Sequence, residues 1–158
     1  MQIVNEMFPS DPAQIRHLMA AGPEGPVFMV NLLKFKARAV YEDGRETTLS
    51  GREAYHLYGR AVADLLPKFG GMGVFAADVS SLVLGKADEL WDEIAIARYP
   101  NRRAMVEMSM SREWREIAVH RTAGLAGQLN IETVLQPDFA PQQVGLFEML
   151  RGVTGAHA

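Results

Sequence analysis

The stretch Val27-Phe28-Met29-Val30-Asn31-Leu32-Leu33-Lys34-Phe35 decides the fold. Its apolar side chains occupy both alternating faces, which predicts a central β-strand covered on both sides. Two polar residues interrupt the run. Asn31 falls on the face that Val27 and Leu33 share, whereas Lys34 falls on the opposite face. A regular strand therefore cannot direct both polar side chains into one pocket.

The segments on either side of this strand predict the remaining elements. Apolar residues recur at helical spacing from Gly51 to Phe69, behind a Ser50 that can cap the helix. Periodicity and turn signals predict two strands joined as a hairpin, a helix broken at 109–111 and a last strand, at residues 74–84, 91–99, 101–124 and 129–135. This order is the α+β, ferredoxin-like βαββαβ plan, an antiparallel sheet with both helices on one face.

The second face of such a sheet has no obvious cover within the chain. The strands carry apolar residues on both faces, so a second copy of the chain is the economical cover and a homodimer is expected. We therefore divide the chain into an N-terminal helical extension, 1–25, whose helix Ser10 or Asp11 can cap, a ferredoxin-like domain, 26–136, and a C-terminal tail, 137–158. One short helix is expected in that tail, at 144–150.

Composition excludes several classes of function. Sixteen Lys and Arg against nineteen Asp and Glu give a formal charge of -3, which provides no general attraction for nucleic acid or an anionic membrane. With no cysteine there is no disulfide, thiolate nucleophile or cysteine-ligated metal centre. Neither a signal sequence nor an apolar run of about 18–20 residues is found, so a cytoplasmic protein with no membrane partner is expected.

Several short motifs occur in an order that is similar to that of a known family. They are Val30-Asn31-Leu32-Leu33-Lys34-Phe35, Ser50-Gly51-Arg52-Glu53-Ala54-Tyr55 followed by Tyr58, Gly70-Gly71, Trp91-Asp92, Arg98-Tyr99-Pro100 and His120-Arg121-x-Ala123-Gly124-Leu125. Over residues 26–136 the sequence resembles the domain of unknown function 1330 family. The resemblance implies the dimeric α/β-barrel superfamily, in which two ferredoxin-like protomers pack sheet against sheet. It implies no reaction, because that family is uncharacterised and the superfamily hosts many activities.

His120 and Arg121 are the candidate catalytic residues. At about 100° per residue, Arg121 falls near the centre of the apolar face of the second main helix and His120 at its edge. Arg121 can bind a substrate carboxylate or enolate, and its charge is expected to lower the pKa of His120, which keeps the imidazole neutral and able to accept a proton. Alternatively, Arg121 pairs structurally with Asp92 or Glu132 and His120 is solvated at a helix end.

Four further residues are candidate substrate-binding groups. Asn31 interrupts an apolar face, where an amide without hydrogen bonds is costly. Tyr55, Trp91 and Tyr99 are amphipathic groups that can line a cavity and orient a ligand. Trp91 and Tyr99 share one strand face with two alanines, whose small side chains leave room either for a ligand or for a closely packed helix.

Other motifs are better explained by structure. The run from Gly71 to Ala76 matches a dinucleotide fingerprint but follows a helix and opens a strand, which is the reverse of the required context. The acidic residues Asp88, Glu89, Asp92 and Glu93 are interpreted as a solvated hairpin turn, and the four histidines have no paired ligand spacing. No cofactor and no metal are therefore expected.

These observations predict a small-molecule enzyme of the dimeric α/β-barrel type. It would act on a hydrophobic or aromatic oxygenated metabolite, by proton transfer or by cofactor-free oxygenation, with His120 moving a proton and Arg121 and Asn31 binding oxygens. The alternative is a non-catalytic small-molecule binding module.

Overall fold

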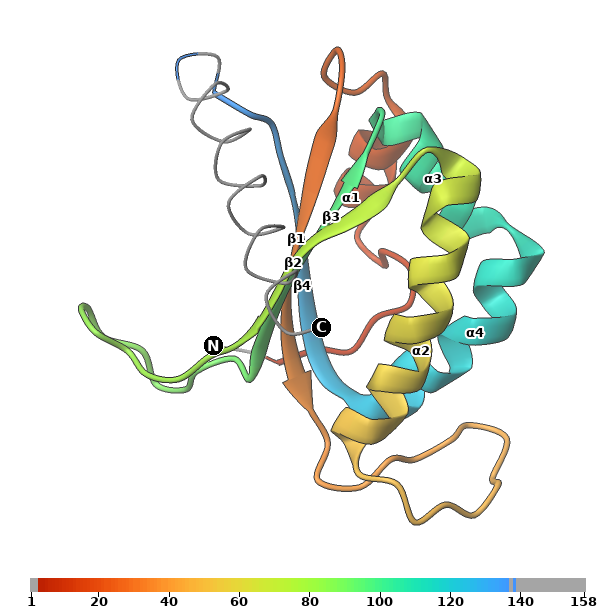
Figure 1. Cartoon of the computed structure of the whole chain (residues 1–158), viewed down its shortest axis with the longest axis vertical. Helices are drawn as coiled ribbons and strands as arrows, with labels where there is room; N and C mark the ends of the chain where they lie inside the picture. The colour runs from red at the N-terminus through yellow and green to blue at the C-terminus, as the bar shows by residue number, and fades with distance from the viewer. Residues whose placement is uncertain (1–2, 137, 139–158) are drawn as a thin grey trace, which may run out of the picture.

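Two long helices cover one side of an antiparallel sheet (Figure 1). The computed structural model describes residues 3–136 and 138. The strands are ordered β2-β3-β1-β4, and β1 pairs antiparallel with both β3 and β4. The elements are α1 Pro12–Met19, β1 Val27–Phe35, α2 Gly51–Leu65, the 3₁₀ helix η1 Leu66–Phe69, β2 Met72–Asp78, β3 Glu93–Tyr99, α3 Arg102–Met110, α4 Arg112–Gly124 and β4 Leu125–Thr133.

This topology confirms the predicted ferredoxin-like fold. The central strand has the predicted bounds, and Ser50 caps α2 in a capping box with Glu53. The second helix is broken at Ser111, whose side chain caps α4. Asp11 caps α1, which is one of the two alternatives expected at that end. The short helix expected at 144–150 lies outside the described residues.

The bounds of β2, β3 and β4 differ from those predicted, most of all at the hairpin and at the start of β4. The ladder between β2 and β3 ends at Asp78 and Glu93, and residues 79–92 form a hairpin arm that extends away from the sheet (Figure 1). The apolar residues near the tip of this arm are open to solvent, and Val83 and Leu84 are 92% and 91% exposed. The last strand begins earlier than predicted. Strand β4 starts at Leu125, directly after α4, because a bulge at the end of β1 pairs Leu125 with Phe35.

The main hydrophobic core lies between β1 and the helices. It contains Val27 and Met29 from β1, Leu65 from the end of α2, and Met108 and Trp114 from α3 and α4. Trp114 is also held by a hydrogen bond from its Nε1 to the Tyr58 hydroxyl, at 3.2 Å. Burial of these apolar groups is the main favourable term that fixes the helices against the sheet.

A close backbone contact joins α2, α4 and the end of β1. The Gly51 amide donates to the Lys36 carbonyl at 3.1 Å, and the Lys36 amide donates to the Gly124 carbonyl at 2.9 Å. A Cβ on Gly51 would lie 2.2 Å from the Lys36 oxygen, and one on Gly124 would lie 2.3 Å from the Gly51 oxygen. Only glycine allows the two helices to approach this closely.

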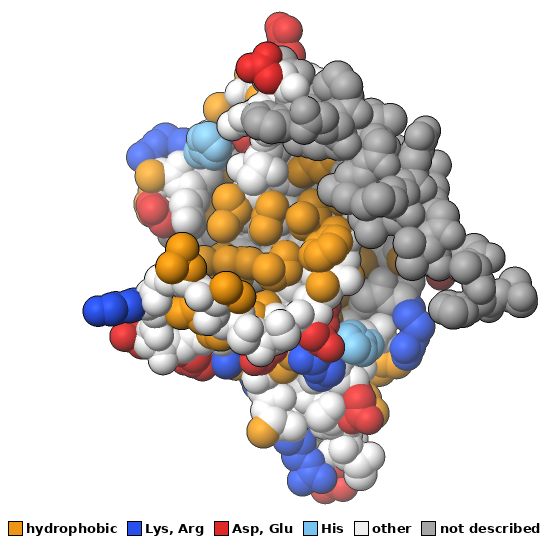
Figure 2. Space-filling model, turned by 60° about the vertical axis from the view of Figure 1, so that its left-hand side comes forward, with side chains coloured by type: hydrophobic (Ala, Val, Ile, Leu, Met, Phe, Trp, Pro, Cys, Tyr) orange, Lys and Arg blue, Asp and Glu red, His pale blue; other side chains and the backbone are white. Residues whose placement is uncertain are grey.

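The opposite face of the sheet is apolar. Residues on this face alternate with those that face the helices, and Figure 2 shows apolar side chains gathered on it. Leu129 and Ile131, both on β4, are 43% and 44% exposed. Their neighbours on the same face are Val30, Leu32, Ile94 and Ile96.

The N-terminal segment, residues 3–11, packs against the start of β4. The Gln128 amide donates to the Val4 carbonyl at 3.0 Å. The Asn5 side chain donates to the Leu125 carbonyl at 2.8 Å, and Phe8 packs on Trp114 with ring centroids 5.8 Å apart. This segment therefore lies across one side of the space between the sheet and the helices.

We expect Gly124→Ala to destabilise the protein strongly. The added Cβ would overlap backbone atoms, which can move only by separating the two helices, and a loss of about 3 kcal/mol is expected from overpacking. Gly59→Ala in the same pair of helices is the matched control, because its Cβ would meet nothing within 4 Å. That change should raise stability by about 0.5–1 kcal/mol. Urea unfolding measures both, and equal effects would contradict the close contact.

Candidate functional site

A cavity of about 1670 Å³ lies between the sheet and the helices. Small residues make room for it at the centre of the sheet, where Ala76, Ala95 and Ala97 face the helices. Helix α2 forms the opposite wall, and the N-terminal segment and α1 form another. The alternative raised by the sequence, a helix packed closely on the alanines, is therefore not the one that the structure adopts.

Arg121 lines this cavity from the last turn of α4 and is only 7% exposed. Its Nη2 donates to the Glu6 carbonyl at 2.8 Å and to the side-chain oxygen of Gln128. Its Nη1 is buried and has no hydrogen-bond partner in the described part of the chain. Burial lowers the pKa of Arg121, since a charged group loses its hydration there.

The two carboxylates expected as structural partners of Arg121 are engaged elsewhere, so that alternative was wrong. Asp92 accepts hydrogen bonds from the Lys34 side chain at 3.1 Å and from the Phe35 amide at 2.8 Å. Glu132 accepts a two-point hydrogen bond from Arg102. Within the residues that the structure describes, no carboxylate lies within ion-pair distance of Arg121. Its charge is thus buried without a counter-ion in that part of the protein.

A chain of amides orients Arg121 toward the cavity. The Gln128 Nε2 donates to the Asn31 Oδ1 at 2.6 Å, and the Asn31 Nδ2 donates to the backbone carbonyls of Met29 and Ala95 at 3.1 and 3.2 Å. Asn31 therefore satisfies its own hydrogen bonds and holds Gln128, which in turn accepts from Arg121. These contacts limit the directions in which the guanidinium can turn.

Tyrosines form the aromatic part of the wall. Tyr55 and Tyr99 line the cavity, and burial raises the pKa of each phenol well above its ordinary value. The charge of Glu93 also raises the pKa of Tyr55 and that of Arg121 lowers it, so both charged groups act on this phenol. At neutral pH the hydroxyls stay protonated and can donate to a ligand oxygen.

His120 and Trp91 do not line the cavity. The His120 Nδ1 lies 2.7 Å from the Tyr41 hydroxyl in the loop before α2, so His120 faces away from the side that Arg121 faces. Burial lowers the pKa of His120, and the Arg45 charge contributes to that shift. The expected direction of the shift is correct, but Arg121 is not its cause. Trp91 lies at the base of the hairpin arm, before β3 begins.

Glu93, Arg52 and His56 form a charged group in the cavity, and none of them was among the candidate site residues. Glu93 is buried at 8% exposure, so it does not belong to a solvated turn, and that interpretation was wrong. Its Oε2 lies 3.3 Å from the Arg52 Nη1 and 3.4 Å from the His56 Nε2. Two sequence patterns could have identified these residues. Glu93 shares one strand face with Ala95, Ala97 and Tyr99, and Arg52 and His56 lie four residues apart on one side of a helix.

The cavity contains no cluster of metal-ligand type in the described chain. Among residues 3–136 and 138, no group of three or more His, Asp or Glu side chains is placed to hold a metal ion. None of the described helices has the length and apolar character that crossing a membrane requires.

Comparison with known proteins identifies similar structures but no curated relative. No family model matches the chain, and no curated protein matches it. The crystal structure of methylated RPA0582 protein is 35% identical, with a TM-score of 0.72 over 84% of this chain and 96% of that one. A structure of the RPA0582 protein of unknown function from Rhodopseudomonas palustris is 32% identical, with a TM-score of 0.72 over 85% and 100%. A dimeric, ferredoxin-like protein of unknown function from Bacteroides fragilis is 10% identical, with a TM-score of 0.48 over 70% and 96%.

We expect His120 to titrate below its ordinary pKa of 6.5, because burial disfavours the imidazolium. Arg45→Gln should raise that pKa, whereas Arg38→Gln on the same loop should leave it unchanged. Since the unfolded chain binds this proton more readily, the contribution of His120 should make the protein less stable as the pH falls below about 6.5. Histidine NMR titration checks the three values, and an equal shift in both variants would exclude Arg45 as a cause.

Proposed function

Since the chain belongs to the family of the RPA0582 protein from Rhodopseudomonas palustris, whose function is unknown, we propose a function from its own cavity. The protein binds a small, largely apolar metabolite through an anionic oxygen, and it catalyses proton transfer on that metabolite. The proposed ligand is a carboxylate or an enolate with a hydrophobic or aromatic body.

The observation that carries this proposal is that the Arg121 Nη1 has no hydrogen-bond partner among the residues that the structure describes. A buried guanidinium nitrogen without a hydrogen bond leaves the cost of its desolvation uncompensated. An anionic oxygen in the cavity would supply the missing acceptor, and a charge-assisted hydrogen bond is stronger there than in water. Such a bond is also directional, because Gln128 and the Glu6 carbonyl already hold the other nitrogen.

The walls of the cavity suit the rest of such a ligand. Met29, Ala95, Ala97 and Met105 offer apolar surface, and the Tyr55 and Tyr99 phenols offer donors beside it. When a proton leaves a carbon next to a carbonyl, the remaining negative charge moves to the oxygen, where Arg121 would stabilise it. Proton transfer therefore needs nothing beyond groups that this chain supplies.

A non-catalytic binding module is the second candidate. The position of His120 outside the cavity favours it, because the imidazole that the sequence suggested for proton transfer cannot contact a ligand there. Both candidates require the same Arg121 contact, so turnover separates them and binding does not.

We expect Arg121→Gln to abolish the preference of the cavity for an anion. Cinnamate and its neutral amide, cinnamamide, are suitable probes because they have nearly the same size and shape and only cinnamate carries a charge. Wild-type protein should bind cinnamate at least tenfold more tightly, which corresponds to about 1.4 kcal/mol. In Arg121→Gln the two probes should bind equally. Titration calorimetry measures all four values.

Arg103→Gln is the matched control for loss of an arginine, since Arg103 is exposed and pairs with Glu107 outside the cavity. It should retain the preference for cinnamate. Wild-type protein that binds neither probe, or binds both equally, would exclude an anion site at Arg121.

We also propose that two copies of the chain pack together through the sheet face that lies opposite the helices, here called the open face. The apolar residues on that face and their exposure support this arrangement (Figure 2), since contiguous apolar patches of this kind mark interaction surfaces. A sheet-to-sheet dimer would bury them without involving the helices that enclose the cavity.

We expect light scattering to give the mass of a dimer at micromolar concentration, with an interface of the usual size of about 1,600 Å². Leu129→Glu places a charge on the open face and should produce a monomer. Val119→Glu adds the same charge at an exposed position of α4, away from the open face, and should leave the dimer intact. A monomeric wild-type protein would rule out the dimer.

A further inference from the structure

We propose that Glu93 is the catalytic base of this cavity and that His56 carries the proton between Glu93 and solvent. This inference rests on the proposed function, in which Arg121 binds the anionic oxygen of the ligand. It assigns the removal and exchange of the proton to Glu93 and His56, neither of which was among the candidate site residues.

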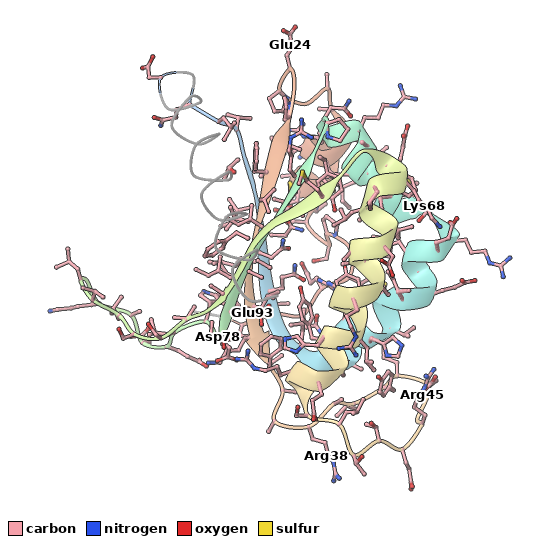
Figure 3. All side chains as sticks on the ribbon, in the orientation of Figure 1. Glu24, Arg38, Arg45, Lys68, Asp78 and Glu93 are labelled. Carbon is pink, nitrogen blue, oxygen red and sulfur yellow. The ribbon has the colours of Figure 1, made fainter. Side chains whose placement is uncertain are left out.

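Glu93 lies at the inner end of the hairpin arm, where it faces the cavity. It pairs with Asp78 across β2 and β3, and Figure 3 labels both residues at that end of the sheet. It shares the helix-facing side of β3 with the alanines that make room for the cavity. At 8% exposure its carboxylate is removed from bulk water, and it lines the same space as Arg121.

The contacts of Glu93 leave one of its oxygens available. Arg52 and His56 both approach Oε2, at 3.3 and 3.4 Å. In the described part of the chain, Oε1 receives no hydrogen bond. A carboxylate held through one oxygen and free at the other is oriented and can still accept a proton.

His56 connects this buried carboxylate to water. Its side chain is 46% exposed, whereas that of Glu93 is 10% exposed, and the His56 Nε2 faces the Glu93 carboxylate. An imidazole can hold a proton on either ring nitrogen, so it can pass a proton between a carboxylate on one side and water on the other. The order cavity, Glu93, His56, solvent is therefore a continuous route for a proton.

Glu93 on β3 and Arg121 on α4 both line the cavity and both act on Tyr55. The charges of both residues act on the Tyr55 phenol, with opposite effects on its pKa. Tyr55 itself lines the cavity from the wall formed by α2. A ligand beside Tyr55 thus lies near both the proposed base and the cation.

The proposed step balances without an oxidant or a cofactor. A C–H bond next to the ligand carbonyl breaks, and its proton goes to the Glu93 Oε1. The electron pair of that bond stays on the ligand as an enolate, whose oxygen Arg121 holds. The proton then returns to the ligand or leaves through His56 and is replaced from solvent.

Deuterium exchange into phenylpyruvate tests this inference. Phenylpyruvate is an apolar aromatic 2-oxo acid with exchangeable benzylic protons, and NMR in D2O follows their loss. Wild-type protein should accelerate the exchange above the buffer rate. Glu93→Gln should slow it at least 100-fold, which is typical of losing a general base, while the Kd for phenylpyruvate changes less than threefold.

Asp78→Asn is the matched control, because Asp78 is the other carboxylate that pairs with Arg52 and its side chain is 72% exposed. Its exchange rate should equal that of wild type. His56→Ala should slow exchange, and added imidazole should restore it, because the position is open to solvent. A purely structural His56 would show no such rescue.

The outcomes separate this inference from the proposed function. Exchange that persists in Glu93→Gln at the wild-type rate would overturn the assignment of the base and leave proton transfer standing. Absence of exchange in wild-type protein that binds phenylpyruvate would overturn the assignment together with the enzymatic proposal, leaving the binding module. If Asp78→Asn loses exchange as Glu93→Gln does, the loss comes from disturbing Arg52, their shared partner. That result would also overturn the assignment of Glu93 as the base.

Discussion

The contact between Gly51 and Gly124 is the constraint on which the rest of the structure depends. It fixes the first turn of α2 against the last turn of α4, and Lys36 ties both to the end of β1. Helix α2 contributes residues 52, 55 and 56 to the cavity and α4 contributes Arg121, whereas the proposed base Glu93 lies on β3. The proposed proton carrier His56 and the proposed anion site at Arg121 therefore owe their relative positions to one backbone contact.

The cavity exists because the two layers of the fold do not pack closely at its centre. The small alanine side chains on the sheet leave a space beneath the helices. Polar groups that line this space are more costly to bury than apolar ones. Asn31 and Gln128 offset that cost with hydrogen bonds to each other and to the backbone. Within the described residues the Nη1 of Arg121 is left without such compensation, and the proposed anion site rests on this nitrogen.

Local features made most of the fold predictable from the sequence. Alternation identified β1, the Ser50 cap identified the start of α2, and helical periodicity correctly placed Arg121 on the buried face. The errors have tertiary causes. The hairpin arm has the composition of a strand, but the ladder between β2 and β3 ends at Asp78 and Glu93 and the tip of the arm is exposed. Strand β4 begins early because Phe35 supplies a partner for Leu125. Glu93 was misread because its acidic neighbours are exposed, whereas its strand phase turns it inward.

The N-terminal segment contributes a wall to the cavity although it precedes the βαββαβ unit. Glu6, Met7 and Phe8 line the space, and the Glu6 carbonyl accepts directly from Arg121. The segment contacts β4 and Trp114, but its residues lie outside the βαββαβ unit, so substitutions in it can reshape the cavity wall while the sequence of that unit stays unchanged. The proposed ligand preference can therefore vary in a part of the chain that is separate from the strands and the two main helices. Related proteins could diverge in the molecules they recognise by changing this one segment, while the scaffold stays the same.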